Sequence, residues 1–161
     1  MKKMVLSLLV DNTSGVLARV AGLFSRRGYN IDSLTVGITE DPKFSRMTVA
    51  VSGDDLILSQ IKKQLLKLED VKTITELKGG ESVVRELMLV KILTDMTERQ
   101  QIISLANVFR AQVVDVSADS VMIEMTGNTN KIEAFIKLLD GFRIVEMVRT
   151  GLTGLTRTAG E

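Results

Sequence analysis

The residues best suited to chemistry lie between Asp11 and Leu17, where an apolar run ends in a polar turn and a helical pattern begins. A helix N-terminus carries unpaired backbone N–H groups, which favour an anion. Gly15 lets a ligand approach the backbone closely, and the Asn12 amide can donate to a carboxylate or accept from an ammonium group. These groups match the needs of a free α-amino acid. The alternative is structural: Ser14 or Asn12 caps the helix, and Gly15 fits the turn.

The residue types that the chain lacks exclude several classes of site. The 161 residues include no His and no Cys. The commonest general base, the commonest metal ligand and any thiolate nucleophile are therefore absent, and zinc, copper and haem sites are not expected. The composition leaves a carboxylate site for Mg²⁺ open.

No spacing of the remaining Ser, Lys, Asp and Glu residues indicates an active site. The chain has no GxGxxG, GxxxxGK[ST] or GxSxG motif. We therefore predict no catalytic residues, and a stand-alone enzyme is the first alternative to a binding module.

A nucleic-acid-binding regulator is the second alternative. Arg19, Arg26 and Arg27 could form a basic patch, but a solvated helix face explains them better. The net charge is +1, aromatic residues make up 4% of the chain, and residues 46–51 contain none of them for base stacking. We expect no nucleic-acid partner.

The N-terminal residues do not resemble a secretory signal. Residues 1–10 hold two lysines and a short apolar run that ends at Asp11. No stretch approaches the ~20 apolar residues of a membrane span. We expect a cytoplasmic protein without a membrane partner.

Apolar periodicity predicts the same order of elements twice. In the first half, strands are expected at residues 5–10, 31–38, 46–51 and 71–77, and helices after residues 15 and 54. In the second half, strands are expected at 83–93, 113–116, 121–125 and 142–148, with helical faces at 102–109 and 132–139. The order β-α-β-β-α-β is that of the ferredoxin-like motif, so the fold class is α+β with two such domains in tandem.

The predicted domains are residues 1–78 and 83–161, joined by a linker at 79–82. The Gly- and Thr-rich tail, residues 150–161, is expected to be mobile unless a partner orders it. Two helices cover one face of a four-stranded sheet and leave the other open. Pairing of two copies would cover it, so we expect a homodimer.

The segment from Asp11 to Leu17, followed by Val20, Leu23 and Phe24, resembles the first loop and helix of an ACT domain, a module that binds amino acids and regulates metabolic enzymes. More specific segments are similar to the regulatory small subunit of acetolactate synthase, also called acetohydroxyacid synthase. These segments are residues 26–36, 45–48, 85–91, 109–111 and 151–157.

This resemblance implies a non-catalytic subunit that activates a catalytic large subunit and confers feedback inhibition, commonly by valine. Thiamine diphosphate, Mg²⁺ and FAD are expected on the large subunit and no cofactor on this chain. Valine is expected between the ACT domains of a homodimer. The residues implied for its site are Asn12, Ser14, Gly15, Val16 and Leu17 from one copy, Asn30 and Ile31 from the other, and Val36 in the apolar wall.

Overall fold

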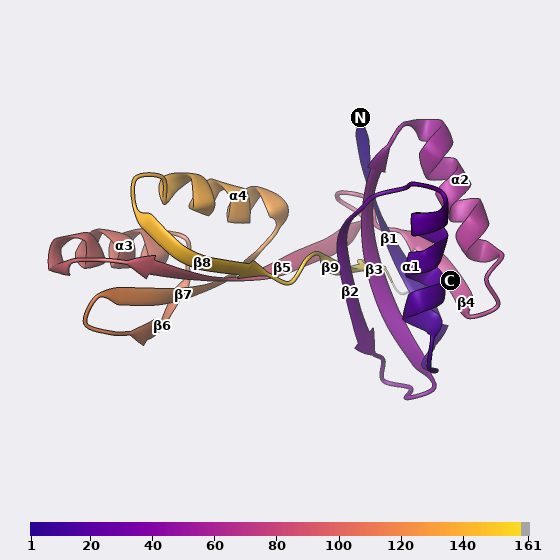
Figure 1. The fold of residues 1–161 in the computed structure, drawn as a ribbon, viewed down its shortest axis with the longest axis horizontal. Helices are drawn as coiled ribbons and strands as arrows, with labels where there is room; N and C mark the ends of the chain where they lie inside the picture. Colours follow the sequence, from indigo (N-terminus) through magenta and orange to yellow (C-terminus); the bar gives the residue numbers. More distant parts are fainter. Residues whose placement is uncertain (159–161) are drawn as a thin grey trace. The chain divides into compact units, whose positions relative to one another are not determined.

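Two units with the same order of elements make up the computed structural model, which describes residues 1–158 (Figure 1). The first unit consists of residues 1–84 together with 152–158, and the second of residues 85–151. The α+β class and the tandem βαββαβ arrangement are thereby confirmed. The observed division differs from the predicted domains because the chain returns to the first unit at Leu152.

The first unit contains β1 (Lys2–Asp11), α1 (Val16–Arg26), β2 (Ile31–Ile38), β3 (Phe44–Gly53), α2 (Asp55–Leu66) and β4 (Val71–Glu76). Its four strands form an antiparallel sheet in the order β2-β3-β1-β4. β2 and β4 are therefore the edge strands of this path, and both helices lie on one face of the sheet (Figure 1).

The core of the first unit lies between this face and the helices. Successive side chains of a strand point to opposite faces, so alternate residues of β1 and β3 project toward the helices. The register pairs Leu6 with Val49 and Leu8 with Met47, and all four are buried. The helices complete this core, at helical spacing, with Val16, Val20, Leu23 and Phe24 from α1 and Leu58, Ile61 and Leu65 from α2.

The opposite face of this sheet is polar in its centre and is partly covered by the chain's own C-terminal segment. Ser7 and Thr48 are paired on this face and are buried. Leu152 lies at β2, where its backbone N–H donates to Ser33 Oγ at 2.7 Å and its carbonyl accepts from Thr35 Oγ1 at 3.1 Å. The next residues form β9 (Thr153–Thr156), which pairs with β5 (Ser82–Leu93) and contacts β3.

Two expectations from the sequence are corrected by this segment. The sheet face expected to be open is partly covered, and residues 153–156, expected to be mobile, form a strand. The reason is a long-range pairing: the Arg157 N–H also donates to the Glu81 carbonyl at 2.8 Å. Residues 159–161 of the predicted tail lie outside the described residues.

Gly154 allows the close approach of β9 to the start of β5. A Cβ atom at this position would lie 2.6 Å from the Val83 carbonyl oxygen and 2.9 Å from a methyl carbon of Val84. The contact with a backbone atom is too short for any side chain. We name residues 152–156 the strap.

The second unit repeats the pattern with the part of β5 from Arg85 onward, α3 (Met96–Val108), β6 (Gln112–Val116), β7 (Ser120–Gly127), α4 (Thr129–Leu138) and β8 (Arg143–Arg149). Its strand order is β6-β7-β5-β8, which matches that of the first unit. Its core lies between alternate side chains of β5 and β7 and the side chains of α3 and α4. Met88, Val90, Ile123 and Phe135 are among its residues.

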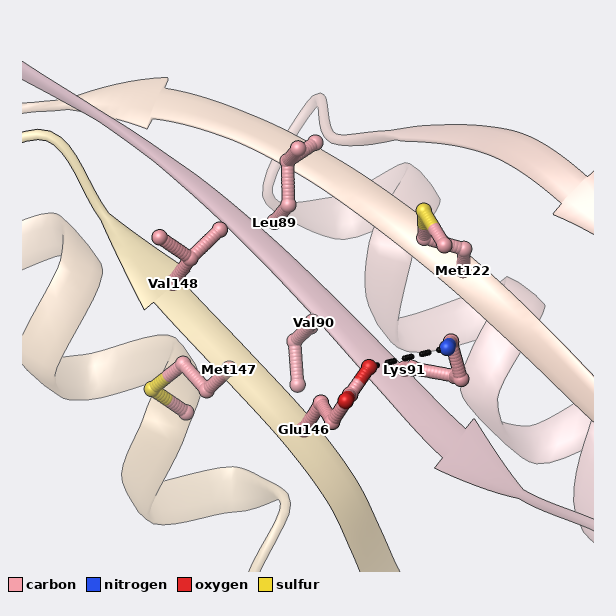
Figure 2. A pocket seen from close by; sticks show the side chains of 7 residues that line it. All are labelled: Leu89, Val90, Lys91, Met122, Glu146, Met147 and Val148. Carbon is pink, nitrogen blue, oxygen red and sulfur yellow. Dashed lines mark hydrogen bonds and ion pairs between the residues drawn. The ribbon is translucent and has the colours of Figure 1, made fainter.

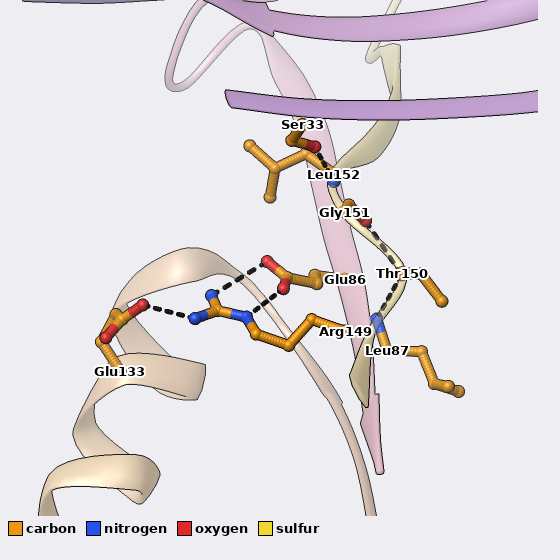
Figure 3. Close-up of polar contacts among 8 residues, drawn as sticks. All are labelled: Ser33, Glu86, Leu87, Glu133, Arg149, Thr150, Gly151 and Leu152. Atoms are coloured by element: carbon orange, nitrogen blue, oxygen red, sulfur yellow. Dashed lines mark hydrogen bonds and ion pairs between the residues drawn. The ribbon is translucent and has the colours of Figure 1, made fainter. Parts of the chain in front are cut away.

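An ion pair between a buried glutamate on β5 and a partly exposed arginine on β8 joins the first and last strands of the second unit. Glu86 is buried, and both of its carboxylate oxygens accept from the Arg149 guanidinium (Figure 3). Arg149 Nη1 also donates to Glu133 Oε1 at 2.8 Å. Hydrogen bonding to Glu86 is the main cause of the raised pKa of Arg149.

None of the helices in residues 1–158 has the length and the apolar character that a membrane-spanning helix needs.

Candidate functional site

Helix α1 begins without a capping side chain. Its N-cap residue is Gly15, in the left-handed conformation with φ 87° and ψ −7°. The first hydrogen bond into the helix runs from the Arg19 N–H to the Gly15 carbonyl at 3.0 Å. The preceding N–H groups, of Val16, Leu17 and Ala18, therefore lack helical acceptors.

The other three helices within the described chain each begin with a capping side chain. Asp54 accepts from the Ile57 N–H, Asp95 from the Glu98 N–H and Asn128 from the Lys131 N–H. The structural alternative for the first turn, in which Ser14 or Asn12 caps α1, is therefore wrong. The free N–H groups of α1 remain available to an anion.

Asn12 is held in one orientation at the end of β1. Its Nδ2 donates to the Pro42 carbonyl at 2.9 Å, and its Oδ1 accepts from Ser45 Oγ at 3.2 Å. Its backbone N–H donates to the Lys43 carbonyl at 2.8 Å. These bonds fix the turn that leads to Gly15. They leave one amide hydrogen of Asn12 for a ligand, since the group has two.

A fixed cation lies beside this turn. Arg19 Nε and Nη2 donate to the two carboxylate oxygens of Asp70, at 2.5 Å and 3.1 Å. Its Nη1 lies 2.9 Å from the position that a Cβ atom on Gly15 would take. Hydrogen bonding between the two side chains raises the pKa of Arg19 and lowers the pKa of Asp70. Sequence reasoning assigned Arg19 to a solvated helix face, because the partner 51 residues away is visible only in the fold.

An apolar edge accompanies the polar turn. Leu17 on α1 and Val36 on β2 are each 47% exposed, and Ile38, two residues further along β2, is 68% exposed. Val36 pairs with the core residue Met47, so it projects toward the face that carries α1. Ile38 was missed as a site residue, although its i, i+2 spacing from Val36 places it on the same face.

Asn30 and Ile31 lie at the far end of the sheet from Asn12. Ser45, which contacts Asn12, is paired with Ile38, whereas Ile31 is paired with Val51. Those two positions of β3 are six residues apart, which corresponds to about 20 Å along a strand. The predicted site residues therefore do not come together within one chain. Asn30 itself donates to Asp32 Oδ1 at 3.1 Å.

The second unit has a hollow of about 430 Å³ that contains none of the predicted site residues (Figure 2). Among its lining side chains are Leu89, Met122 and Val148. Its charged lining residues, Lys91 and Glu146, pair with each other at 2.9 Å, and this contact lowers the pKa of Glu146. The hollow therefore offers a charged metabolite no unpaired countercharge. Residues 1–158 contain no cluster of three or more His, Cys, Asp or Glu side chains arranged to hold a metal.

Two family models match successive parts of the chain. One, described as an AHAS small subunit-like ACT domain, matches residues 6–73. The other, described as the small subunit of acetolactate synthase, matches residues 85–158.

Whole-chain relatives agree with these matches. The chain is 50% identical over 156 residues to an acetolactate synthase small subunit from Mycobacterium bovis, covering 97% of this chain and 93% of the relative. It is 48% identical over 154 residues to a probable acetolactate synthase small subunit from Methanothermobacter thermautotrophicus, covering 95% and 92%. A crystal structure of the acetolactate synthase small subunit from Thermotoga maritima matches with a TM-score of 0.90 and 40% identity, over 99% of this chain and 100% of that chain. The chain therefore belongs to the acetolactate synthase small-subunit family and carries its ACT domain at the N-terminal end.

Proposed function

We propose that this protein activates the catalytic large subunit of acetolactate synthase and makes it sensitive to feedback inhibition by valine. The observation that carries the valine site is the uncapped start of α1 beside an exposed apolar edge. The free N–H groups supply positive potential for a carboxylate, while Leu17, Val36 and Ile38 supply an apolar wall for a branched side chain. The charge of Arg19 is paired with Asp70, but its Nη1 takes no part in that pair and lies beside Gly15 as a further donor.

The site is completed by a second copy of the chain. β2 is an edge strand, and two copies related by a two-fold axis can pair their β2 strands antiparallel. Such pairing places the Asn30–Ile31 end of one strand near the Val36–Ile38 end of the other. That arrangement joins the two sets of predicted site residues, which one chain holds about 20 Å apart.

Regulation requires the large subunit to bind two states of the small subunit with different affinity. Valine at the seam between two ACT domains favours one arrangement of that dimer, and it inhibits only if the large subunit distinguishes the arrangements. In this proposal thiamine diphosphate, Mg²⁺ and FAD belong to the large subunit, and this chain contributes no catalytic group.

Calorimetric titration of the purified protein with valine, leucine, isoleucine and lysine tests the site. We expect saturable binding of valine and none of lysine. Leucine and isoleucine differ from valine by one methylene, which changes binding by only ~1–3 kcal/mol, so their titrations decide the preferred ligand.

The variant Gly15→Asp locates the site, and Gly15→Asn is its control. Both side chains tolerate the left-handed conformation better than other residues and are similar in size. The carboxylate of Asp would face the carboxylate of valine, so we expect Gly15→Asp to weaken binding about tenfold relative to Gly15→Asn. Equal valine affinity in the two variants would refute this location.

A further inference from the structure

Strand β2 takes part in two sets of contacts on its opposite faces. On the face that carries α1, it presents Val36 and Ile38 to the proposed amino-acid site. On the other face, Ser33 and Thr35 bind the strap residue Leu152. Figure 3 shows the contact between Ser33 and Leu152. Side chains alternate along a strand, so neighbouring residues of one element serve the ligand and the strap.

Both backbone polar groups of Leu152 depend on β2. The Leu152 N–H donates to Ser33 Oγ at 2.7 Å, and the Leu152 carbonyl accepts from Thr35 Oγ1 at 3.1 Å. Leu152 is 4% exposed, so water does not readily replace a lost partner. A displacement of β2 therefore either carries Leu152 with it or leaves buried polar groups unpaired.

The residues before Leu152 are held in the second unit. The Thr150 N–H donates to the Leu87 carbonyl at 3.0 Å, and Thr150 Oγ1 accepts from the Leu87 N–H at 3.1 Å. The preceding residue, Arg149, is held by the buried Glu86. Gly151, with φ 90°, is the one residue between these two anchored positions.

We propose that Ser33 and Thr35, by binding Leu152, couple the proposed amino-acid site on β2 to the second unit through the covalent connection at Gly151. This inference rests on the proposed function. It assigns a regulatory role to two hydroxyl groups that do not line the ligand site. It also requires that the large subunit senses the second unit.

The test compares the double variant Ser33→Ala/Thr35→Val with Thr75→Val. The double variant removes both hydroxyls that bind Leu152 and nearly keeps the side-chain volumes. Thr75 is paired with Ser7, on the same sheet face but on the other edge strand β4, and makes no bond to Leu152. A third variant, Ser33→Thr/Thr35→Ser, keeps both hydroxyls and serves as the rescue.

For the unmodified protein and each variant, calorimetry measures valine affinity twice, for the small subunit alone and for its complex with the large subunit. The rate of acetolactate synthesis by each complex is measured at saturating valine. If the large subunit binds the two arrangements with different affinity, linkage requires the complex and the small subunit alone to bind valine with different affinity, and we expect a difference of about fivefold or more for the unmodified protein. For the double variant we expect less than about a twofold change, with activation retained and inhibition largely lost. Thr75→Val and the rescue variant should behave like the unmodified protein.

The outcomes separate this inference from the function on which it rests. Failure of the unmodified protein to bind valine would overturn the proposed function and the coupling with it. Valine binding with full inhibition of the double variant would overturn the coupling alone. If the double variant does not fold, the coupling is tested by hydrogen exchange of the Leu152 amide in the unmodified protein. We expect valine to change the exchange rate of this amide about fivefold. An unchanged rate would refute the coupling.

Discussion

At the scale of single residues, the first turn of α1 is defined by a glycine and a cation rather than by a cap. Gly15 supplies the left-handed conformation, and Arg19 lies beside it, held by Asp70. Only a residue without a Cβ leaves this space to the guanidinium without displacement. The same two residues thus decide the backbone geometry and the local charge of the proposed site.

The ion pair of Arg19 and Asp70 makes stability depend on pH in a predictable direction. Arg19 lowers the pKa of Asp70 in the folded protein, whereas an unfolded Asp has a pKa of about 3.9. The folded state therefore binds this proton less well, so the stabilisation is complete above about pH 4–5 and is lost as the pH falls through the folded pKa. We predict that Asp70→Asn lowers the urea midpoint at pH 7 and that this difference is smaller at about pH 2.5.

The control for these urea measurements is Glu69→Gln. The Glu69 carboxylate makes none of the ion pairs found among residues 1–158, so its variant should match the unmodified protein at both pH values. A constant difference between Asp70→Asn and the unmodified protein from pH 7 to 2.5 would contradict the electrostatic explanation.

At the scale of elements, the starts of α1 and α2 offer a direct comparison. Asp54 caps α2 through the Ile57 N–H at 2.9 Å, so Asp54→Ala should cost about 1 kcal/mol in the free energy of unfolding. Ser14 makes no corresponding bond to α1, so Ser14→Ala should cost less than about 0.5 kcal/mol. Urea denaturation measures both values. A loss of about 1 kcal/mol in the free energy of unfolding of Ser14→Ala would show that Ser14 caps α1, contrary to the structure.

The edge strand β2 supplies a second prediction at this scale. Ile38 and Leu56 have the same exposure, 68%, but Ile38 lies on the proposed dimer edge and Leu56 on α2. A buried, unpaired lysine is costly, so Ile38→Lys should raise the dimer dissociation constant by about tenfold or more. Leu56→Lys should leave it unchanged. Sedimentation at a series of concentrations measures both, and equal dissociation constants would exclude this edge as the interface.

The elements themselves were largely predictable from the sequence. The strand predicted at residues 31–38 has the observed bounds, and the helix expected after residue 54 begins there, capped by Asp54. These features depend on local alternation and on residues three positions apart. β9 was missed because its Gly- and Thr-rich sequence has no apolar alternation, and its partner lies about 70 residues earlier in the chain.

The candidate site was predictable in its parts and not in its geometry. The polar turn and Gly15 follow from residue types, but the bonds that orient Asn12 come from Pro42 and Ser45. Likewise the position of the Arg19 guanidinium beside Gly15 depends on its ion pair with Asp70. Contacts of this kind depend on strand register, which one sequence does not specify residue by residue.

At the scale of the whole molecule, the two units share a strand order but treat the face opposite the helices differently. In the first unit, Ser7 and Thr48 lie on that face, which is partly covered by the strap. In the second unit, the side chains of Leu89 and Met122 line the hollow. The repeated fold thus gave rise to two different surfaces, and among the described residues the strap covers part of the first.

The strap should therefore stabilise the first unit and not the second. Ending the chain after Gly151 removes Leu152, whose burial alone is worth about 2 kcal/mol, together with the pairing of β9. We predict faster hydrogen exchange throughout residues 2–76 and unchanged exchange in residues 88–149. The matched control ends after Thr158 and keeps the whole strap. Equal loss of protection in both units would show that the strap supports the molecule as one cooperative structure, whereas no loss in either would show that β9 contributes nothing to its stability.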